Sequence, residues 1–89
     1  MANNSIGLIE LTSIAAGYQA ADAMLKASNV DMMLSRSICS GKYMVMVRGD
    51  VAAVQASVDA AAQVVGQKGM LVNKVVIPHP RAELLNEMI

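Results

Sequence analysis

The residues with catalytic chemistry are few and lie far apart along the chain. The single cysteine, Cys39, and the single histidine, His79, stand in different halves of the sequence. They give no persuasive nucleophile and base, and together they fall short of the four ligands of a structural zinc site. Glu10 and Asp22 are the only carboxylates predicted in packed positions, and we expect Glu10 to pair with a basic residue or to cap a neighbour. Because the glycine-containing turn at 66–69 lacks the spacing of a phosphate-binding loop, the sequence predicts that the protein is not an enzyme.

The composition excludes further classes and favours an oligomer. Of the 89 residues, 55% are hydrophobic and 16% are charged, whereas an ordinary soluble domain is about 25% charged. One small domain cannot bury so much apolar surface, so we expect the surplus at interfaces between copies of the chain. Seven basic residues balance seven acidic ones, and two tyrosines are the only aromatic residues, which argues against nucleic-acid binding. No apolar run approaches the ~18 residues of a membrane helix, no export signal opens the chain, and one cysteine fits a reducing cytoplasm.

The spacing of apolar and turn residues predicts the elements that position these side chains. Strands are expected at 6–11, 30–37, 43–48 and 70–77, and helices at 14–28, 51–65 and 81–88. The order is β-α-β, β-α-β and a last helix, which predicts an α+β fold of the ferredoxin-like, split βαβ type. In this fold a four-stranded antiparallel sheet carries helices on one face, and here a short C-terminal helix follows. No linker or repeat interrupts the sequence, so residues 1–89 are predicted to form one domain.

The two longer helices carry further signals. Thr12 or Ser13 is predicted to cap the first helix, Asn29 to end it in a left-handed conformation, and Asp50 to cap the second helix. The first helix has one apolar stripe and, beside it, a stripe of small residues that would let another backbone approach closely. The first stripe comprises Ile14, Tyr18, Ala21 and Leu25, and the second comprises Gly17, Ala20, Met24 and Ala27.

Four strings of residues resemble bacterial microcompartment shell proteins in their order and spacing. They are Gly7–Glu10 (GLIE), Ala20–Ala27 (AADAMLKA), Arg48–Val54 (RGDVAAV) and Val75–Pro78 (VVIP), and together they extend over nearly the whole chain. The resemblance is to the single-domain type of shell protein. It implies a homo-hexamer with a central pore for small polar metabolites, located in the cytoplasm. Such hexamers would contact neighbouring hexamers and other shell proteins in the microcompartment shell, with no nucleic-acid or membrane partner.

The resemblance also implies which residues lie at the hexamer edge. Lys26 and Asn29 would meet their counterparts in the next hexamer, whereas Lys26 taken alone is a solvated cation that stabilises a helix end. After Pro78 the chain departs from the family pattern, because many members place an arginine where this chain has His79-Pro80-Arg81. Either Arg81 or His79 takes the edge role, or His79 is simply exposed in a turn.

The loop between the second and third strands would line the pore with Ser37, Ile38, Cys39, Ser40 and Gly41. Its sequence Ile38–Lys42 (ICSGK), together with Leu8–Ala15, resembles the tandem-domain, trimeric shell protein of propanediol compartments. In that branch three cysteines at the axis hold an iron–sulfur cluster, but its loop has a proline in place of Ser40 and its chain has two domains. Three interpretations of Cys39 stay open: a thiol that lines the pore, a ligand of an iron–sulfur cluster or other metal at the symmetry axis, and a redox-switched disulfide across the ring.

Two other functions compete with the shell interpretation. A small oligomeric regulatory module of ferredoxin-like fold would bind a metabolite at a subunit interface, but it does not account for the four matching strings. In the other alternative Cys39 is the centre of an electron carrier, and the shell is only its support. No cofactor is certain from the sequence, and an iron–sulfur cluster at the axis is the one candidate.

Overall fold

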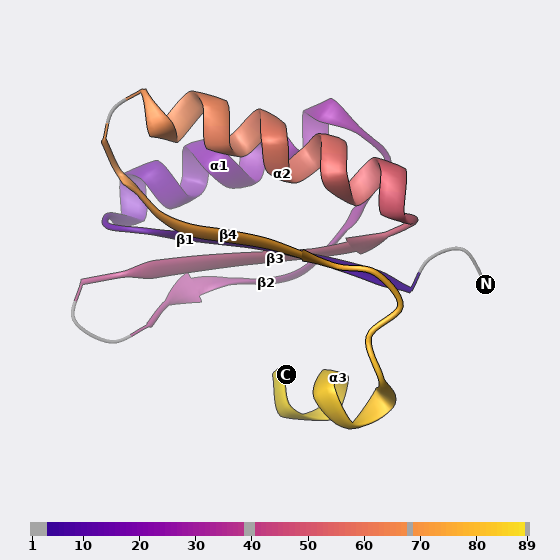
Figure 1. Cartoon of the computed structure of the whole chain (residues 1–89). Helices are drawn as coiled ribbons and strands as arrows, with labels where there is room; N and C mark the ends of the chain where they lie inside the picture. Colours follow the sequence, from indigo (N-terminus) through magenta and orange to yellow (C-terminus); the bar gives the residue numbers. More distant parts are fainter. Residues whose placement is uncertain (1–3, 39–40, 68, 89) are drawn as a thin grey trace.

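A computed structural model describes residues 4–38, 41–67 and 69–88 and confirms the predicted α+β fold (Figure 1). Each predicted boundary lies within one residue of the observed one. The elements in chain order are β1 (Ser5–Leu11), α1 (Ile14–Ala27), β2 (Asp31–Ser37), β3 (Tyr43–Gly49), α2 (Val51–Gly66), β4 (Leu71–Ile77) and α3 (Ala82–Met88).

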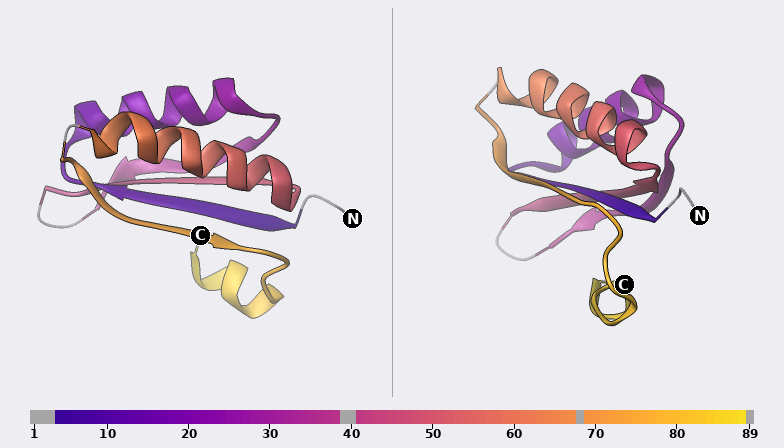
Figure 2. Two further views of the ribbon diagram at one scale, coloured as in Figure 1. Left: turned by 45° about the horizontal axis from the view of Figure 1, so that its top comes forward. Right: turned by 45° about the vertical axis from the view of Figure 1, so that its right-hand side comes forward.

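The four strands form one antiparallel sheet in the order β2-β3-β1-β4. Helices α1 and α2 lie side by side over one face of this sheet, and α3 lies beyond the opposite face (Figures 1 and 2). In the part of the chain that the structure describes, no helix is long and apolar enough to cross a membrane.

The strand register defines two ends of the sheet. At one end Asp31, Arg48, Ile6 and Ile77 form a row across the four strands, and at the other end the row is Ser37, Tyr43, Leu11 and Leu71. Each strand has seven residues, so the two rows are about 20 Å apart. Loops that leave the sheet at different ends are therefore held at opposite sides of the domain.

The core lies between the sheet and the two helices that cover it. Buried side chains of β1 and β3, such as Ile9 and Val45, pack against α1 and α2, whose contributions include Met24 and Val58. Gly7 on β1 allows α2 to approach closely, because a Cβ at this position would overlap the side chains of Val54 and Val58.

The stripe of small residues, and not the stripe of large apolar residues, is the buried side of α1. Gly17, Ala20 and Met24 are buried, whereas Ala27 at the end of this stripe is exposed. The group that approaches Gly17 is the Tyr43 side chain and not the backbone that was expected. In the other stripe only Ala21 is buried, while Ile14, Tyr18 and Leu25 are 52%, 66% and 48% exposed. The large side chains of this stripe therefore point away from the core of the single chain.

The predicted helix caps are largely confirmed, with one correction. Ser13 caps α1 by accepting the Ala16 N–H at 3.0 Å, and Asp50 caps α2 by accepting the Ala53 N–H at 2.8 Å. Asn29 is not left-handed, because His79 alone among the described non-glycine residues has a positive φ. The chain instead leaves α1 through Ser28, which has an extended backbone and a side chain hydrogen-bonded to α2.

Candidate functional site

The loop between β2 and β3 is closed by a backbone hydrogen bond. The Ile38 N–H donates to the Lys42 carbonyl at 2.8 Å, so the two strands remain joined beyond their last sheet pair. Gly41 has a φ of +75°, in the left-handed region where a side chain is strained. Of the predicted pore residues, Ser37 is the last residue of β2, and Ile38 and Gly41 lie in the loop that follows it. Cys39 and Ser40 lie outside the described residues.

A buried tyrosine braces the base of this loop. Tyr43 is only 4% exposed, and its hydroxyl is 2.7 Å from the Ser35 Oγ on the adjacent strand. Its ring lies where a Cβ on Gly17 would be, so the glycine of α1 is what makes room for it. Tyr18 meets the same ring edge to face, with 5.9 Å between the ring centroids. The position of the loop is therefore tied to α1 as well as to the sheet.

One ion pair lies beside the loop. The Lys42 Nζ is 4.0 Å from the Glu10 Oε2, and the Glu10 side chain is the more buried of the two. The expectation that Glu10 pairs with a basic residue is confirmed. The carboxylate of Glu10 therefore serves as the ion-pair partner of Lys42 in the loop.

The predicted edge residues Lys26 and Asn29 lie together at the C-terminal end of α1. Both are exposed. The Lys26 Nζ is 2.9 Å from the Asp22 Oδ2, one helical turn earlier. The prediction that Asp22 is packed is wrong, because its side chain is 62% exposed on the outer side of α1. The spacing of an acidic residue four positions before a lysine is a sequence signal that predicts this pair. Asn29 lies between α1 and the first residue of β2, Asp31.

His79 and Arg81 lie after β4, in the segment that leads to α3. The left-handed backbone of His79, with a φ of 51°, turns the chain from the sheet toward α3 (Figure 1). His79 is exposed, and the Arg81 Nη2 is 3.3 Å from the Glu83 Oε2 in an exposed ion pair. Neither residue is engaged with the core.

The sheet separates the predicted pore residues from the predicted edge residues. The loop at 38–42 follows the row that contains Ser37 and Tyr43, whereas Asn29 precedes and His79 follows the opposite row. Asn29 is next to β2 and His79 next to β4, which are the two outer strands. The edge residues thus occupy one end of the sheet at its two sides, and the loop occupies the other end.

Two serines that the sequence did not single out connect α1 to α2. The buried Ser57 Oγ donates to the Met24 carbonyl at 2.7 Å, and the Ser28 Oγ donates to the Ala53 carbonyl at 2.6 Å. The two hydroxyl oxygens are 3.3 Å apart. A serine within an alanine-rich helix carries no sequence signal for such a contact.

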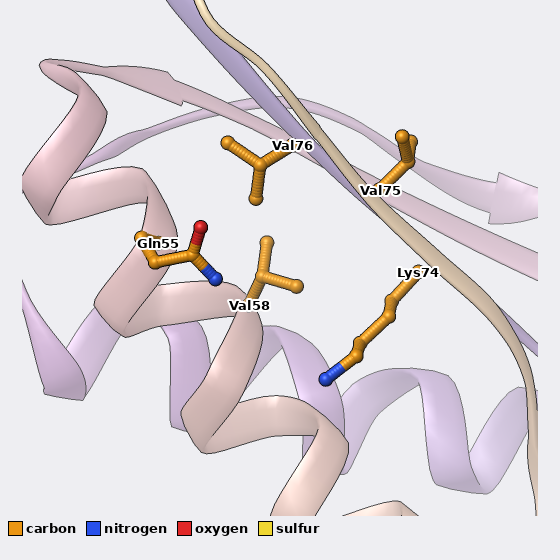
Figure 3. A pocket seen from close by; sticks show the side chains of 5 residues that line it. All are labelled: Gln55, Val58, Lys74, Val75 and Val76. Atoms are coloured by element: carbon orange, nitrogen blue, oxygen red, sulfur yellow. The ribbon is translucent and has the colours of Figure 1, made fainter.

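A shallow groove between α2 and β4 is lined by Gln55, Val58, Lys74, Val75 and Val76 (Figure 3). Its polar groups already have partners, because Asp59 accepts a hydrogen bond from Gln55 at 3.1 Å and lies 3.8 Å from the Lys74 Nζ. We assign no ligand to this groove. Among the described residues, no group of three His, Cys, Asp or Glu side chains is placed to hold a metal ion.

Comparison with known proteins identifies the fold and its type of function. The model of the BMC domain family matches residues 5–80. The chain belongs to the BMC domain family. This BMC domain is 45% identical over 83 residues to the bacterial microcompartment shell protein PduT of Citrobacter freundii, and it covers 44% of that protein. It is 41% identical over 80 residues to the shell protein EutM of Salmonella typhimurium and covers 83% of it.

A solved structure supports the same assignment. The BMC domain superposes on a crystal structure described as a microcompartments protein from Desulfitobacterium hafniense DCB with a TM-score of 0.84 and 44% identity. The match covers 92% of this chain and 44% of that one. The chain therefore spans less than half the length of this protein and of PduT, but most of the length of EutM.

These relatives confirm the coarser predictions. The fold class, the shell-protein family and the location in a microcompartment shell are confirmed, and the relatives are named as shell proteins and not as enzymes. The family assignment also favours the shell over the regulatory module, and the electron carrier stays an open alternative. The hexamer, the pore, the edge roles and the chemistry of Cys39 stay predictions.

Proposed function

We propose that this BMC domain forms a cyclic hexamer that tiles the facets of a bacterial microcompartment and encloses a central pore. The observation that carries the proposal is the separation of two sets of residues by the sheet. The hairpin loop at 38–42 lies at one end, and Lys26, Asn29 and His79 lie at or beyond the other. A wedge-shaped subunit of a disc requires this arrangement, with one end at the axis and the other at the rim.

Uncovered apolar surface supports the ring. Three large side chains of α1 point outward: Ile14, Tyr18 and Leu25 are 52%, 66% and 48% exposed. On the other face of the sheet, Leu8 and its direct partner Val75 on β4 are also partly exposed. A ring forms when two different surfaces of one chain pack against each other. This chain presents two different apolar surfaces, one on each layer. Burying them would account for the high hydrophobic content.

Contacts between rings would involve the residues at the rim. In a two-fold contact, Lys26 and Asn29 of one ring face residues of the next ring, and Arg81 or His79 occupies the place of the arginine that many family members carry. Each exposed polar contact contributes only about 0–1 kcal/mol. Sheets of discs would therefore depend on many such contacts acting together.

The pore would be lined by the loop residues Ser37, Ile38, Cys39, Ser40 and Gly41. A ring of backbone N–H groups and small polar side chains favours small polar or anionic metabolites. Three roles for Cys39 compete here: a lining thiol, a ligand of an iron–sulfur cluster shared between chains, and half of a disulfide that closes the pore. The support for the cluster is the resemblance to the tandem-domain branch and the thiolate preference of iron–sulfur centres.

Electron microscopy of the purified protein tests the proposal. We expect six-fold particles at low concentration and hexagonal sheets or tubes at high concentration. Particles without six-fold symmetry, or a protein that stays monomeric at all concentrations, would contradict it. A saturable small-molecule stabilisation in such a monomer would favour the regulatory module instead.

A further inference from the structure

The end of α1 is held by hydroxyl groups from buried and half-buried serines. Ser57 on α2 is fully buried, and its Oγ donates to the Met24 carbonyl at 2.7 Å. Ser28 directly follows α1, and its Oγ donates to the Ala53 carbonyl on α2 at 2.6 Å. The last four carbonyls of a helix have no partner within the helix, and the Met24 carbonyl is the first of these four in α1. Ser57 therefore supplies, from a neighbouring helix, a partner that the end of α1 needs.

The segment that these serines hold is the one that carries Lys26 and Asn29. Both side chains of the Lys26–Asp22 ion pair are exposed. The pair therefore contributes little to holding the lysine in one position. The backbone at Asn29 lies close to Gly49 on β3. A Cβ added to Gly49 would lie 3.3 Å from the Asn29 carbonyl oxygen. The position of the edge segment thus depends on buried contacts beneath it.

We propose that Ser57 and Ser28 are positioning residues for the edge of the ring. They hold the Lys26–Asn29 segment in the place where it meets the next ring, and their loss shifts this segment without removing any group that makes the contact. The inference rests on the edge role of Lys26 and Asn29 in the proposed function. It adds that the lateral assembly of rings is controlled from inside the subunit.

The test compares Ser57→Ala and Ser28→Ala with wild-type protein in two assays. Native mass gives the number of chains in the ring, and light scattering against concentration gives the threshold for sheet assembly. Ser35→Ala is the matched control, because it also removes a hydrogen-bonded serine hydroxyl but lies near the loop end of the sheet. Ser28→Thr is the conservative variant, because it retains a hydroxyl at a half-buried position.

We expect both alanine variants to keep the wild-type ring mass and to raise the assembly threshold by about two- to five-fold, the upper value being that of one whole hydrogen bond. The lost bond lies inside the subunit, so only the cost of ordering the loosened edge segment on assembly raises the threshold. Ser35→Ala and Ser28→Thr should assemble near the wild-type threshold. The inference is wrong if wild-type sheets form and both Ser28→Ala and Ser57→Ala assemble like wild type. It is also wrong if Ser35→Ala raises the assembly threshold as much as they do. In both cases the proposed function stands. Should Ser57→Ala fail to fold, Ser28→Ala alone decides the question. If wild-type rings form no sheets, the proposed edge role fails, and the inference fails with it.

Discussion

Replacing Gly17 with alanine should destabilise the protein, although alanine is the better helix former. The new Cβ would lie closer to three atoms of the Tyr43 ring than the 3.0 Å that real Cβ atoms keep. The ring is buried and cannot move into solvent without losing its hydrogen bond to Ser35. The core must therefore deform to accommodate one methyl group.

Three contributions give the size of the effect. Overpacking a core costs about 1–3 kcal/mol, and loss of the Tyr43–Ser35 hydrogen bond costs about 1 kcal/mol. Replacing glycine with alanine inside a helix stabilises the helix by about 1 kcal/mol. We therefore expect Gly17→Ala to lower the free energy of unfolding by about 1–3 kcal/mol, the net of these three values.

Gly66→Ala is the matched control, because Gly66 also lies in a helix but nothing is within 4 Å of its added Cβ. It should leave the stability unchanged or raise it by up to about 1 kcal/mol. The assay is chemical denaturation at one fixed protein concentration, since association alters apparent stability. If Gly17→Ala is as stable as Gly66→Ala, the packing of Tyr43 against α1 is not as described.

Three further predictions test the loop and the edge. Tyr43→Phe keeps the ring and removes only its hydroxyl, so it should lower the unfolding free energy by about 1 kcal/mol in the same denaturation assay. A loss of more than about 2 kcal/mol would exceed the contribution of one hydrogen bond and would contradict this prediction. Gly41→Ala should lower the free energy of unfolding by about 1–2 kcal/mol, because alanine is strained at a positive φ. Gly41→Asn, measured alongside by thermal unfolding, should lower it less, and equal losses would argue against a left-handed backbone at this position. Lys26→Asp should abolish sheets under the electron microscope and leave the native mass of the ring unchanged, whereas a change in ring mass would place Lys26 inside the ring.

The fold was predictable because local signals and the hydrophobic pattern agree. Ser13 and Asp50 each precede a helical stretch and cap it as expected. Strands β1 and β3 combine apolar, β-branched residues with turn signals at their ends, which sets their limits to within one residue. Consistent local and global preferences of this kind are what make a sequence specify one fold.

The faces of α1 were harder to predict from the sequence. Two adjacent stripes are apolar, and the helical period alone does not decide which of them packs inside. The structure selects the small stripe because Gly17 admits the Tyr43 ring, a tertiary contact with a residue far along the chain. The large stripe with Ile14 and Tyr18 remains outward, in keeping with the surplus of apolar residues that predicted an oligomer.

The predicted pore and edge roles stay predictions, whereas the contacts that hold these segments in place could not be predicted from the sequence. The resemblance assigned the loop and the edge, and the register of the sheet places them at opposite ends. The Ser28 and Ser57 hydroxyls join segments distant in sequence, and nothing in their immediate neighbours distinguishes them from solvent-exposed serines. Long-range hydrogen bonds of this kind are set by tertiary packing and leave no periodic signal.

Native mass spectrometry under anaerobic conditions, after addition of iron and sulfide, is the most direct test of the proposed hexamer. We expect a particle of six chains. A mass increase equal to one cluster that is lost in Cys39→Ser would identify Cys39 as a ligand, and six chains without added mass would leave it as a pore-lining thiol. A monomer or a dimer as the largest species would contradict the ring, and with it the proposed function as a shell tile.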